Sequence, residues 1–390
     1  MIKHIFTLIW NKKRSNFLLF LEIFLAFLVL FAVFTLVIYN LRVYQQPLGY
    51  NTQNTLITIL YDSDPDADST FIADSKIRLL KELRTFPEIE AATFTGFVAP
   101  LGNNTWSTSH DHNGFMIETH LFFGDENYDK VAGLNITEGR WFNEDDIRAK
   151  STPVVINQVF KDKYLKDKPI IDSLFHISGA DNKVVGILDH YRYNGEFTAE
   201  DAIVMVYQPG HINDSAGLQI RLKGDPTPAV EQKIGKAIKD IMKKNDFAIQ
   251  HLEQKREQDS KGTWVPIITL LGICTFLIIN IALGLFGVVW YNINKRKGEV
   301  GLRRAIGATT GDISFQFIGE VMAIVLIGIL VGLFFAAQLP WLKLVDIENS
   351  NYYYAMAAAM GIIIVVVLVC TFYPSRQAAG IHPALALHED

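Results

Sequence analysis

Four aspartates alternate along one short polar stretch: Asp62, Asp64, Asp66 and Asp68. Alternating carboxylates open the calcium loop of an EF-hand, which also needs glycine at its sixth position and glutamate at its twelfth. Those two positions hold Ala67 and Ala73, and Pro65 interrupts the run. We therefore expect a solvated loop here and no calcium site.

A second polar stretch offers candidate metal ligands: His110, Asp111, His112 and His120. Two histidines at i and i+2 would share one face of a strand, and imidazole is a common zinc ligand. The flanking residues are rich in Asn and Ser, which favours an exposed loop. We expect that no metal binds at these residues.

The sequence contains no recognisable catalytic constellation. A glycine-rich phosphate loop of the form G-x-x-x-x-G-K-[ST] does not occur in it. We expect no catalytic residue and no bound cofactor in this chain. The formal net charge is −5, without a basic stripe on a folded domain, so nucleic acid is not an expected partner.

Four long apolar blocks dominate the rest of the sequence: about Phe17–Tyr39, Trp264–Tyr291, Ile313–Leu339 and Tyr352–Tyr373. Each is long enough for the roughly 20 apolar residues that cross a bilayer. A backbone in lipid must satisfy its own hydrogen bonds, so four transmembrane helices are predicted. Both cysteines, Cys274 and Cys370, fall within these blocks.

The first and second blocks each support a further expectation. The first is too long for a signal peptide and is followed by Tyr39-Asn40-Leu41-Arg42, so it is expected to stay as an anchor. The second is the longest and should project beyond the bilayer as part of a stalk.

Two carboxylates lie inside the predicted spans. Glu22 falls in the first and Glu320 in the third. An ionisable group within a membrane is costly and is by default a functional candidate. Snorkelling, or pairing with Arg14 or Arg376 at the interface, is the structural explanation that we favour.

Basic residues flank the blocks unevenly. They precede the first span and fill the loop between the second and third spans: Lys3, Lys12, Lys13, Arg14, Lys295, Arg296, Lys297, Arg303 and Arg304. By the positive-inside rule, both termini and the 292–312 loop are cytoplasmic. Segment 40–262 and the short loop 340–351 are outside, and 374–390 forms a cytoplasmic tail. Residues 1–16, with apolar positions at helical spacing, are expected to form an amphipathic helix in the cytoplasmic interface.

The outer segment mixes strand-like and helix-like runs, so an α+β domain is predicted between the first and second spans. Five runs read as strands: Thr55–Tyr61, Pro153–Asn157, Lys183–Leu188, Ala202–Tyr207 and Gly217–Leu222. Residues 72–85 and 226–244 read as amphipathic helices.

The loop between the second and third spans has its own pattern. Residues 298–308 can form a short amphipathic helix, with Thr309 and Asp312 as suitable caps for the helix that follows. A short basic helix at this place can lie on the membrane surface or dock into a partner. A plain positive-inside loop is the alternative.

This stretch resembles the signature of the MacB/FtsX/LolC superfamily of ABC transporter permeases. The matching residues are Arg296, Glu299, Val300, Gly301, Leu302, Arg303, Arg304, Ala305, Ile306, Gly307 and Ala308. The closing Tyr373–Ala379 and His382–Leu387 segments are similar to the family's C-terminal pattern. In the outer segment, Glu138–Phe142, Pro153–Asn157 and Val184–Leu188 resemble a MacB-type periplasmic core domain.

The resemblance implies a mechanism and partners. The eleven matching residues would form a coupling helix on a separate ATPase, which would bind ATP and Mg. Two permease chains and two ATPase subunits would move the outer domain by mechanotransmission. Only 16 residues precede the first span, so the ATPase is expected on another polypeptide. An efflux role would add a membrane-fusion protein and an outer-membrane channel.

Gly328 and Gly332 form a small-xxx-small pair that permits close helix approach. A dimer contact and packing within one chain are equal alternatives, and a homodimer or heterodimer fits equally.

Three functions remain open for a non-catalytic permease subunit in the bacterial inner membrane. The first is export or extraction of antibiotics, peptides or lipoproteins. The second is FtsX-like regulation of a cell-wall hydrolase without transport, and the third is antibiotic sensing. Family analogy alone does not choose among them.

Overall fold

The computed structural model describes residues 13–60, 69–95, 100–101, 106–112, 115–165, 170–177, 180–209, 217–343 and 347–379. The aspartate run 62–68, the amphipathic segment 1–12 and the closing segment 382–387 lie outside these residues. The chain divides into two compact units. One is Val43–Thr263, and the other joins the first 42 residues to Trp264–Asp390.

The helical unit is built on four long helices, with two short ones between them. The long helices are α2 (Lys13–Tyr44), α7 (Leu252–Lys295), α9 (Thr310–Ala336) and α11 (Asn349–Ala379). The short ones are α8 (Lys297–Ala305) and α10 (Gln338–Leu342), so the predicted outer loop 340–351 contains helical residues at both ends. Within the described residues, four helical segments are long and apolar enough to cross a membrane.

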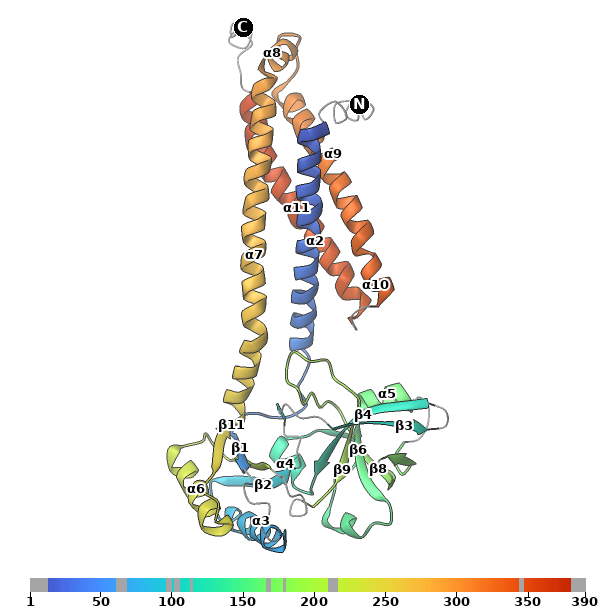
Figure 1. Ribbon diagram of the computed structural model, residues 1–390, viewed down its shortest axis with the longest axis vertical. Coiled ribbons are helices and arrows are strands. Elements are labelled where there is room, and N and C mark those ends of the chain that lie inside the picture. The colour runs from blue at the N-terminus through green and yellow to red at the C-terminus, as the bar shows by residue number, and fades with distance from the viewer. Residues whose placement is uncertain are drawn as a thin grey trace. The chain divides into compact units, whose positions relative to one another are not determined.

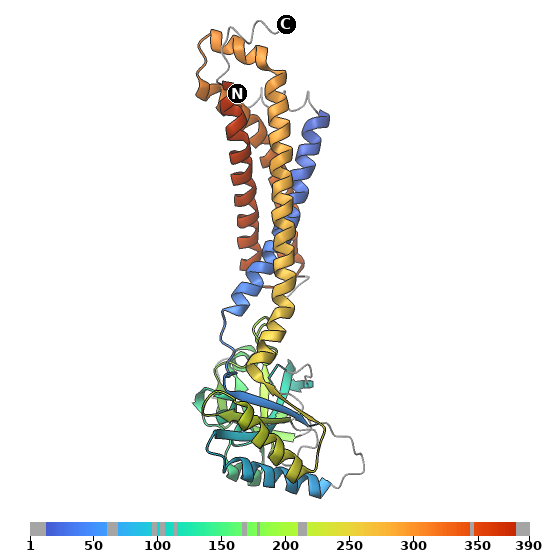
Figure 2. The ribbon, with the colours of Figure 1, turned by 90° about the vertical axis from the view of Figure 1, so that its left-hand side faces the viewer.

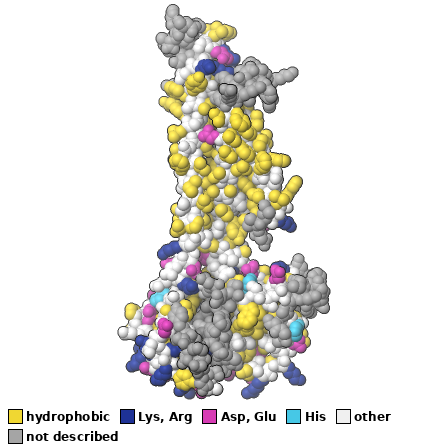
Figure 3. Space-filling model, in the orientation of Figure 1, with side chains coloured by type: hydrophobic (Ala, Val, Ile, Leu, Met, Phe, Trp, Pro, Cys, Tyr) yellow, Lys and Arg dark blue, Asp and Glu magenta, His cyan; other side chains and the backbone are white. Residues whose placement is uncertain are grey.

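The four long helices run side by side (Figures 1 and 2) around one apolar core. Leu30, Leu285, Val325 and Ala359, one from each helix, are all fully buried there. Apolar side chains also cover much of the face of this bundle seen in Figure 3, and Leu25, Phe276, Leu330 and Val369, one from each helix, are exposed. A helix that is apolar all round is typical of a membrane span, where the outer face meets lipid.

Helix α7 is longer than a membrane crossing requires. Its 44 residues correspond to roughly 66 Å at 1.5 Å per residue, about twice a 30 Å hydrocarbon layer. It begins well before the predicted span, as expected for a stalk. Pro266 lies inside this helix and cannot donate a backbone hydrogen bond.

The unit Val43–Thr263 contains two lobes, each with its own sheet. The first lobe has a four-stranded antiparallel sheet in the order β11-β1-β10-β2. Its strands are β1 (Thr55–Leu60), β2 (Ile89–Thr95), β10 (Gly217–Leu222) and β11 (Phe247–His251). Helices α3 (Ser69–Leu83) and α6 (Pro228–Met242) connect them, which gives the βαββαβ order of a ferredoxin-like fold.

The second lobe lies in sequence between β2 and β10. Its seven-stranded mixed sheet has the order β3-β4-β9-β6-β8-β5, with β7 beside β8. The strands are β3 (Trp106–His112), β4 (Phe115–Gly124), β5 (Ile136–Gly139), β6 (Thr152–Asn157), β7 (Leu174–Ile177), β8 (Ala180–Leu188) and β9 (Ile203–Tyr207). Three short helices complete it: α4 (Tyr128–Ala132), η1 (Glu144–Arg148) and α5 (Gln158–Tyr164).

The predicted fold class is confirmed, since an α+β unit lies between the first two membrane helices. One local prediction was wrong. His110, Asp111 and His112 lie in strand β3 and not in a loop, because β3 and β4 form a long antiparallel hairpin. His120 on β4 contacts Ser107 through Nδ1 at 3.0 Å and Asp201 through Nε2 at 3.6 Å.

Candidate coupling site

Helix α8 is a separate short helix, divided from α9 by Gly307 and by the cap of α9. It spans Lys297–Ala305, shorter than the expected 298–308. Gly307 follows with φ +106°, a conformation that residues with a Cβ rarely adopt. Thr309 and Asp312 then form a reciprocal capping box that starts α9, as their spacing predicted.

The apolar residues of this helix do not all point the same way. Val300 is only 3% exposed and packs in the bundle core, whereas Leu302 is 53% and Ile306 is 78% exposed. The helix is therefore anchored in the bundle by Val300, while Leu302 and Ile306 are exposed.

A hydrogen-bonded ion network holds α8 to α9. The Arg296 guanidinium is 2.9 Å from Glu320 Oε2 and 3.6 Å from Glu299 Oε2. Arg303 is 2.8 Å from Glu299 Oε1 and also donates to Gln316, which in turn donates to Glu320. Two of these links, Arg296–Glu320 and Arg303–Gln316, cross from the α8 segment to α9 and tie the two together.

For the two membrane carboxylates, snorkelling or pairing with Arg14 or Arg376 was expected. Glu320 is paired with Arg296 and not with Arg376, while the side chain of Arg14 lies outside the described residues. Glu22 lies against Gly284 of α7, where an added Cβ would be 3.0 Å from Glu22 Oε1. The absence of a side chain at Gly284 thus makes room for that carboxylate.

Gly328 and Gly332 both face α2 of the same chain. A Cβ at Gly328 would lie 3.1 Å from Ile23, and one at Gly332 only 2.5 Å from the Phe27 ring. The two glycines let α9 approach α2 closely, which is the intra-chain alternative for this pair.

The segment that resembles the periplasmic core domain forms the centre of the second lobe. Arg140 binds Asp146 through two parallel hydrogen bonds of 2.7 Å. Burial opposes ionisation of Asp146, but this pairing and the Asn143 N–H together hold its pKa below the usual value. Trp141 donates through Nε1 to the Asp125 carbonyl at 3.0 Å.

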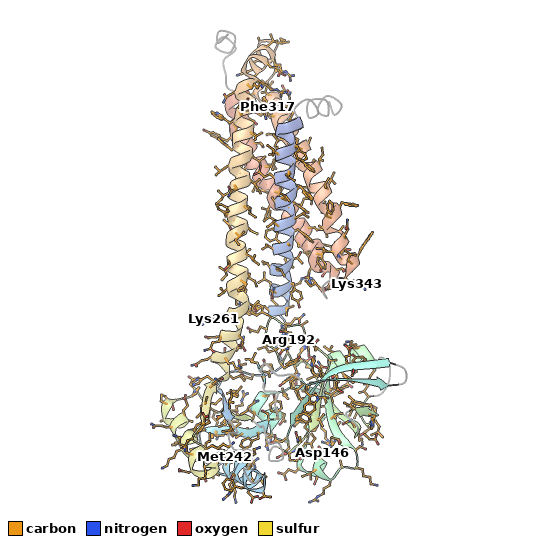
Figure 4. The ribbon with its side chains drawn as sticks, viewed as in Figure 1. Asp146, Arg192, Met242, Lys261, Phe317 and Lys343 are labelled. Carbon is orange, nitrogen blue, oxygen red and sulfur yellow. The ribbon has the colours of Figure 1, made fainter. Side chains whose placement is uncertain are left out.

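One polar network in the unit Val43–Thr263 was not predicted. Arg192 (Figure 4) is only 2% exposed and donates to the carbonyls of Gln46 and Thr198, at 2.8 and 2.9 Å. In the same loop, Glu196 accepts from Arg256 Nε and from Ser260, both at 2.9 Å. These contacts join distant positions in the sequence, so no local spacing could have indicated them.

Comparison with known proteins identifies the family. Residues 17–237 match the family described as MacB-like periplasmic core domain, and residues 271–383 match FtsX-like permease C-terminal. The chain belongs to the MacB/FtsX-type ABC transporter permeases, and it is a multi-pass membrane protein.

Similar proteins occur in several bacteria. The chain is 24% identical over 278 residues to the macrolide export ATP-binding/permease protein MacB 1/2 of Paracoccus denitrificans, covering 68% of this chain and 41% of that one. It is 27% identical over 286 residues to MacB of Neisseria gonorrhoeae, covering 68% and 42%. For the uncharacterized ABC transporter permease YvrN of Bacillus subtilis the identity is 22% over 281 residues, covering 67% and 68%. The chain thus spans about two fifths of the MacB proteins it matches.

Solved structures include two outer domains. The periplasmic region of MacB from Actinobacillus actinomycetemcomitans is 17% identical, with a TM-score of 0.39, covering 56% of this chain and 97% of that one. The extracellular domain of the transporter YknZ is 12% identical, with a TM-score of 0.37, covering 50% and 100%.

Proposed function

We propose that this chain is the permease subunit of an ABC transporter whose ATPase is a separate polypeptide. ATP hydrolysis there moves the outer domain, and the work serves export or extraction of antibiotics, peptides or lipoproteins. Two permease chains and two ATPase subunits, which bind ATP and Mg, form the unit. The orientation proposed from the basic flanks places α8 in the cytoplasm of a bacterial inner membrane.

The observation that carries this proposal is the exposed apolar pair on α8. Leu302 and Ile306 are 53% and 78% exposed at the end of the bundle where Arg303 and Glu299 form an ion pair. Apolar anchors ringed by charged groups are typical of a protein-binding surface. An ATPase groove that covers the pair is the partner we infer.

The outer unit has the contacts needed to convert helix movement into lobe movement. Strand β11 of the first lobe leads directly into α7. In the same unit, Arg256 and Ser260 of α7 bind Glu196 in the second lobe. A displacement of the first turns of α7 therefore acts on both lobes at once, which supports mechanotransmission as the proposed mode.

The test measures ATP hydrolysis by the chain alone and binding of the ATPase subunit to the chain and its variants. We expect the chain alone to hydrolyse no ATP, and Ile306→Asp to weaken ATPase binding by about tenfold or more, since exposed apolar anchors act as hot spots. Leu174→Asp, at a residue 60% exposed in the second lobe, is the matched control and should bind normally. Equal ATPase binding by both variants would contradict the docking role of α8.

Charge exchange gives a sharper version of the test. Arg303→Glu places a carboxylate beside Glu299 and should abolish stimulation, whereas Arg303→Glu with Glu299→Arg restores the pair of opposite charges. Rescue should be partial, because Arg296 also lies 3.6 Å from Glu299. If the double variant were no better than the single one, these residues would not act through their ion pair.

A further inference from the structure

A cavity of about 480 Å³ lies between the two lobes of the outer unit. One wall is α3 of the first lobe, and the other is η1 with the end of β9 in the second. In Figure 4, Met242 marks the first lobe and Asp146, in η1, the second. This volume is within the range of about 300–1,000 Å³ that is common for small-molecule sites.

Both walls of the cavity carry exposed apolar side chains. Ile77 of α3 is 46% exposed, and Ile147 of η1 is 55% exposed. Leu80 and Tyr207 extend these two walls. Because the walls belong to different sheets, a molecule with an apolar body of drug size would contact both lobes at once.

The second-lobe side of the cavity is acidic. Asp125, Glu126 and Glu144 line it, against Lys81 and Arg84 on the α3 wall. Asp125 is only 3% exposed, with Oδ1 accepting from the Asn127 N–H at 3.0 Å.

The electrostatic balance at this wall is negative. Burial, followed by the charges of Glu126, Asp125, Asp146 and Glu144, raises the pKa of Tyr207 to about 12. Burial also raises the pKa of Asp125 to about 6, and Glu126 adds to this rise, while hydrogen bonds and Arg84 oppose it. A cation brought to this wall would relieve the repulsion among the carboxylates.

We propose that the interlobe cavity binds a small cationic amphiphile, with its apolar body between Ile77 and Ile147 and its cationic group at the carboxylates. This deepens the proposed function by naming a class of cargo, and it rests on that function only for the claim that the bound molecule is transported. Binding itself requires no ATPase.

The experiment measures binding of rhodamine 6G, a fluorescent organic cation, to the full chain in lipid nanodiscs. We expect saturable binding that Glu126→Gln with Glu144→Gln weakens by about tenfold, the effect of losing charge-assisted contacts. Ile77→Ser with Ile147→Ser should weaken it similarly. Fluorescein, an anion of comparable size, should not bind saturably.

Matched controls come from exposed residues outside the cavity. Asp225→Asn with Asp240→Asn removes two exposed carboxylates, and Leu174→Ser removes an apolar side chain that is 60% exposed. Both should bind rhodamine 6G as the unchanged chain does. Equal binding by all variants would mean partition into lipid and would overturn the proposal, as would saturable binding of fluorescein.

The two proposals fail separately. If Ile306→Asp left ATPase coupling intact while the cavity variants lost rhodamine binding, the coupling proposal would fall and the cavity would stand. If the cavity variants bound rhodamine normally while α8 variants lost coupling, the reverse would hold. The ligand assignment would also be overturned if an accessory protein bound at the cavity and a cationic probe did not compete with it.

Discussion

Glu320 lies on a membrane helix and is paired by both Arg296 and Gln316. A carboxylate that loses its partner in a poorly hydrated place is destabilising by several kcal/mol, whereas replacing both charges by apolar groups is often neutral. The loss of stability when one charge of the Arg296–Glu320 pair is removed, compared with removal of both, thus measures how poorly hydrated the α8–α9 contact is.

We predict that Arg296→Met lowers the stability of the folded chain by about 3 kcal/mol, because it leaves Glu320 unpaired. The double variant Arg296→Met with Glu320→Leu should recover most of that loss. Thermal unfolding in nanodiscs, followed by tryptophan fluorescence, measures both. Glu348→Gln is the control, since its contact with Arg42 is long, at 3.8 Å, and exposed. An additive double variant would mean that the two charges are independent.

Asp125 makes a separate prediction for pH. Its pKa rises from 3.8 to about 6 in the folded chain, chiefly through burial. The folded state therefore binds the proton more tightly than the unfolded state, so the contribution of Asp125 to stability is greatest below about pH 4 and is lost as pH rises toward 6. Asp125→Asn should remove this dependence while keeping an acceptor for Asn127.

The measurement is chemical denaturation of the full chain between pH 4 and pH 7. At each pH, the free energy of unfolding of the variant is subtracted from that of the unchanged protein. The subtraction matters because Asp146, whose pKa is lowered, changes stability in the opposite direction. A difference between the two proteins that stayed constant over this range would contradict the burial of Asp125.

Among the helices, the contact of α9 with α2 depends on two residues without side chains. The Cβ of an alanine at Gly332 would lie 2.5 Å from the Phe27 ring, which must then move. Gly319, on the same helix, has open space around it and is the matched control.

We expect Gly332→Ala to lower the thermal stability of the bundle by about 1–3 kcal/mol, typical of overpacking. Gly319→Ala should leave it unchanged or slightly higher, because alanine favours helix. Adding Phe27→Leu to Gly332→Ala should restore part of the loss. If Gly332→Ala instead changed only the oligomeric state, this face would serve the contact between chains.

For the whole chain, the arrangement across the membrane depends on the orientation proposed from its basic flanks. The family and the four apolar helices establish a multi-pass membrane protein. The side of the membrane on which each unit lies follows only from the proposed orientation. Gly298 in α8 and Asp225 in the unit Val43–Thr263 are both exposed, so each can carry a reporter.

We predict that a membrane-impermeant maleimide labels Asp225→Cys in intact cells and labels Gly298→Cys only after the membrane is opened. The unchanged chain sets the background, because Cys274 is buried and Cys370 lies within α11. Labelling of both positions from the same side would invalidate the orientation and the coupling mechanism with it.

The sequence by itself determined the features that depend on neighbouring residues. The apolar blocks predicted the membrane helices, since length and hydropathy alone decide whether a helix can cross lipid. Thr309 and Asp312 predicted where α9 begins, because a capping box is made within four residues. The segment around Glu299–Ala308 was sufficient to indicate the family.

Only the tertiary structure decided the contacts that join distant segments. The partner of Glu320 is Arg296, 24 residues away, and Arg192 reaches Gln46 across 146 residues. The β3–β4 hairpin was also not predicted from the sequence, because the polar residues of β3 do not alternate with apolar ones. Such contacts depend on how the elements pack in three dimensions, and local propensity contains no information about that packing.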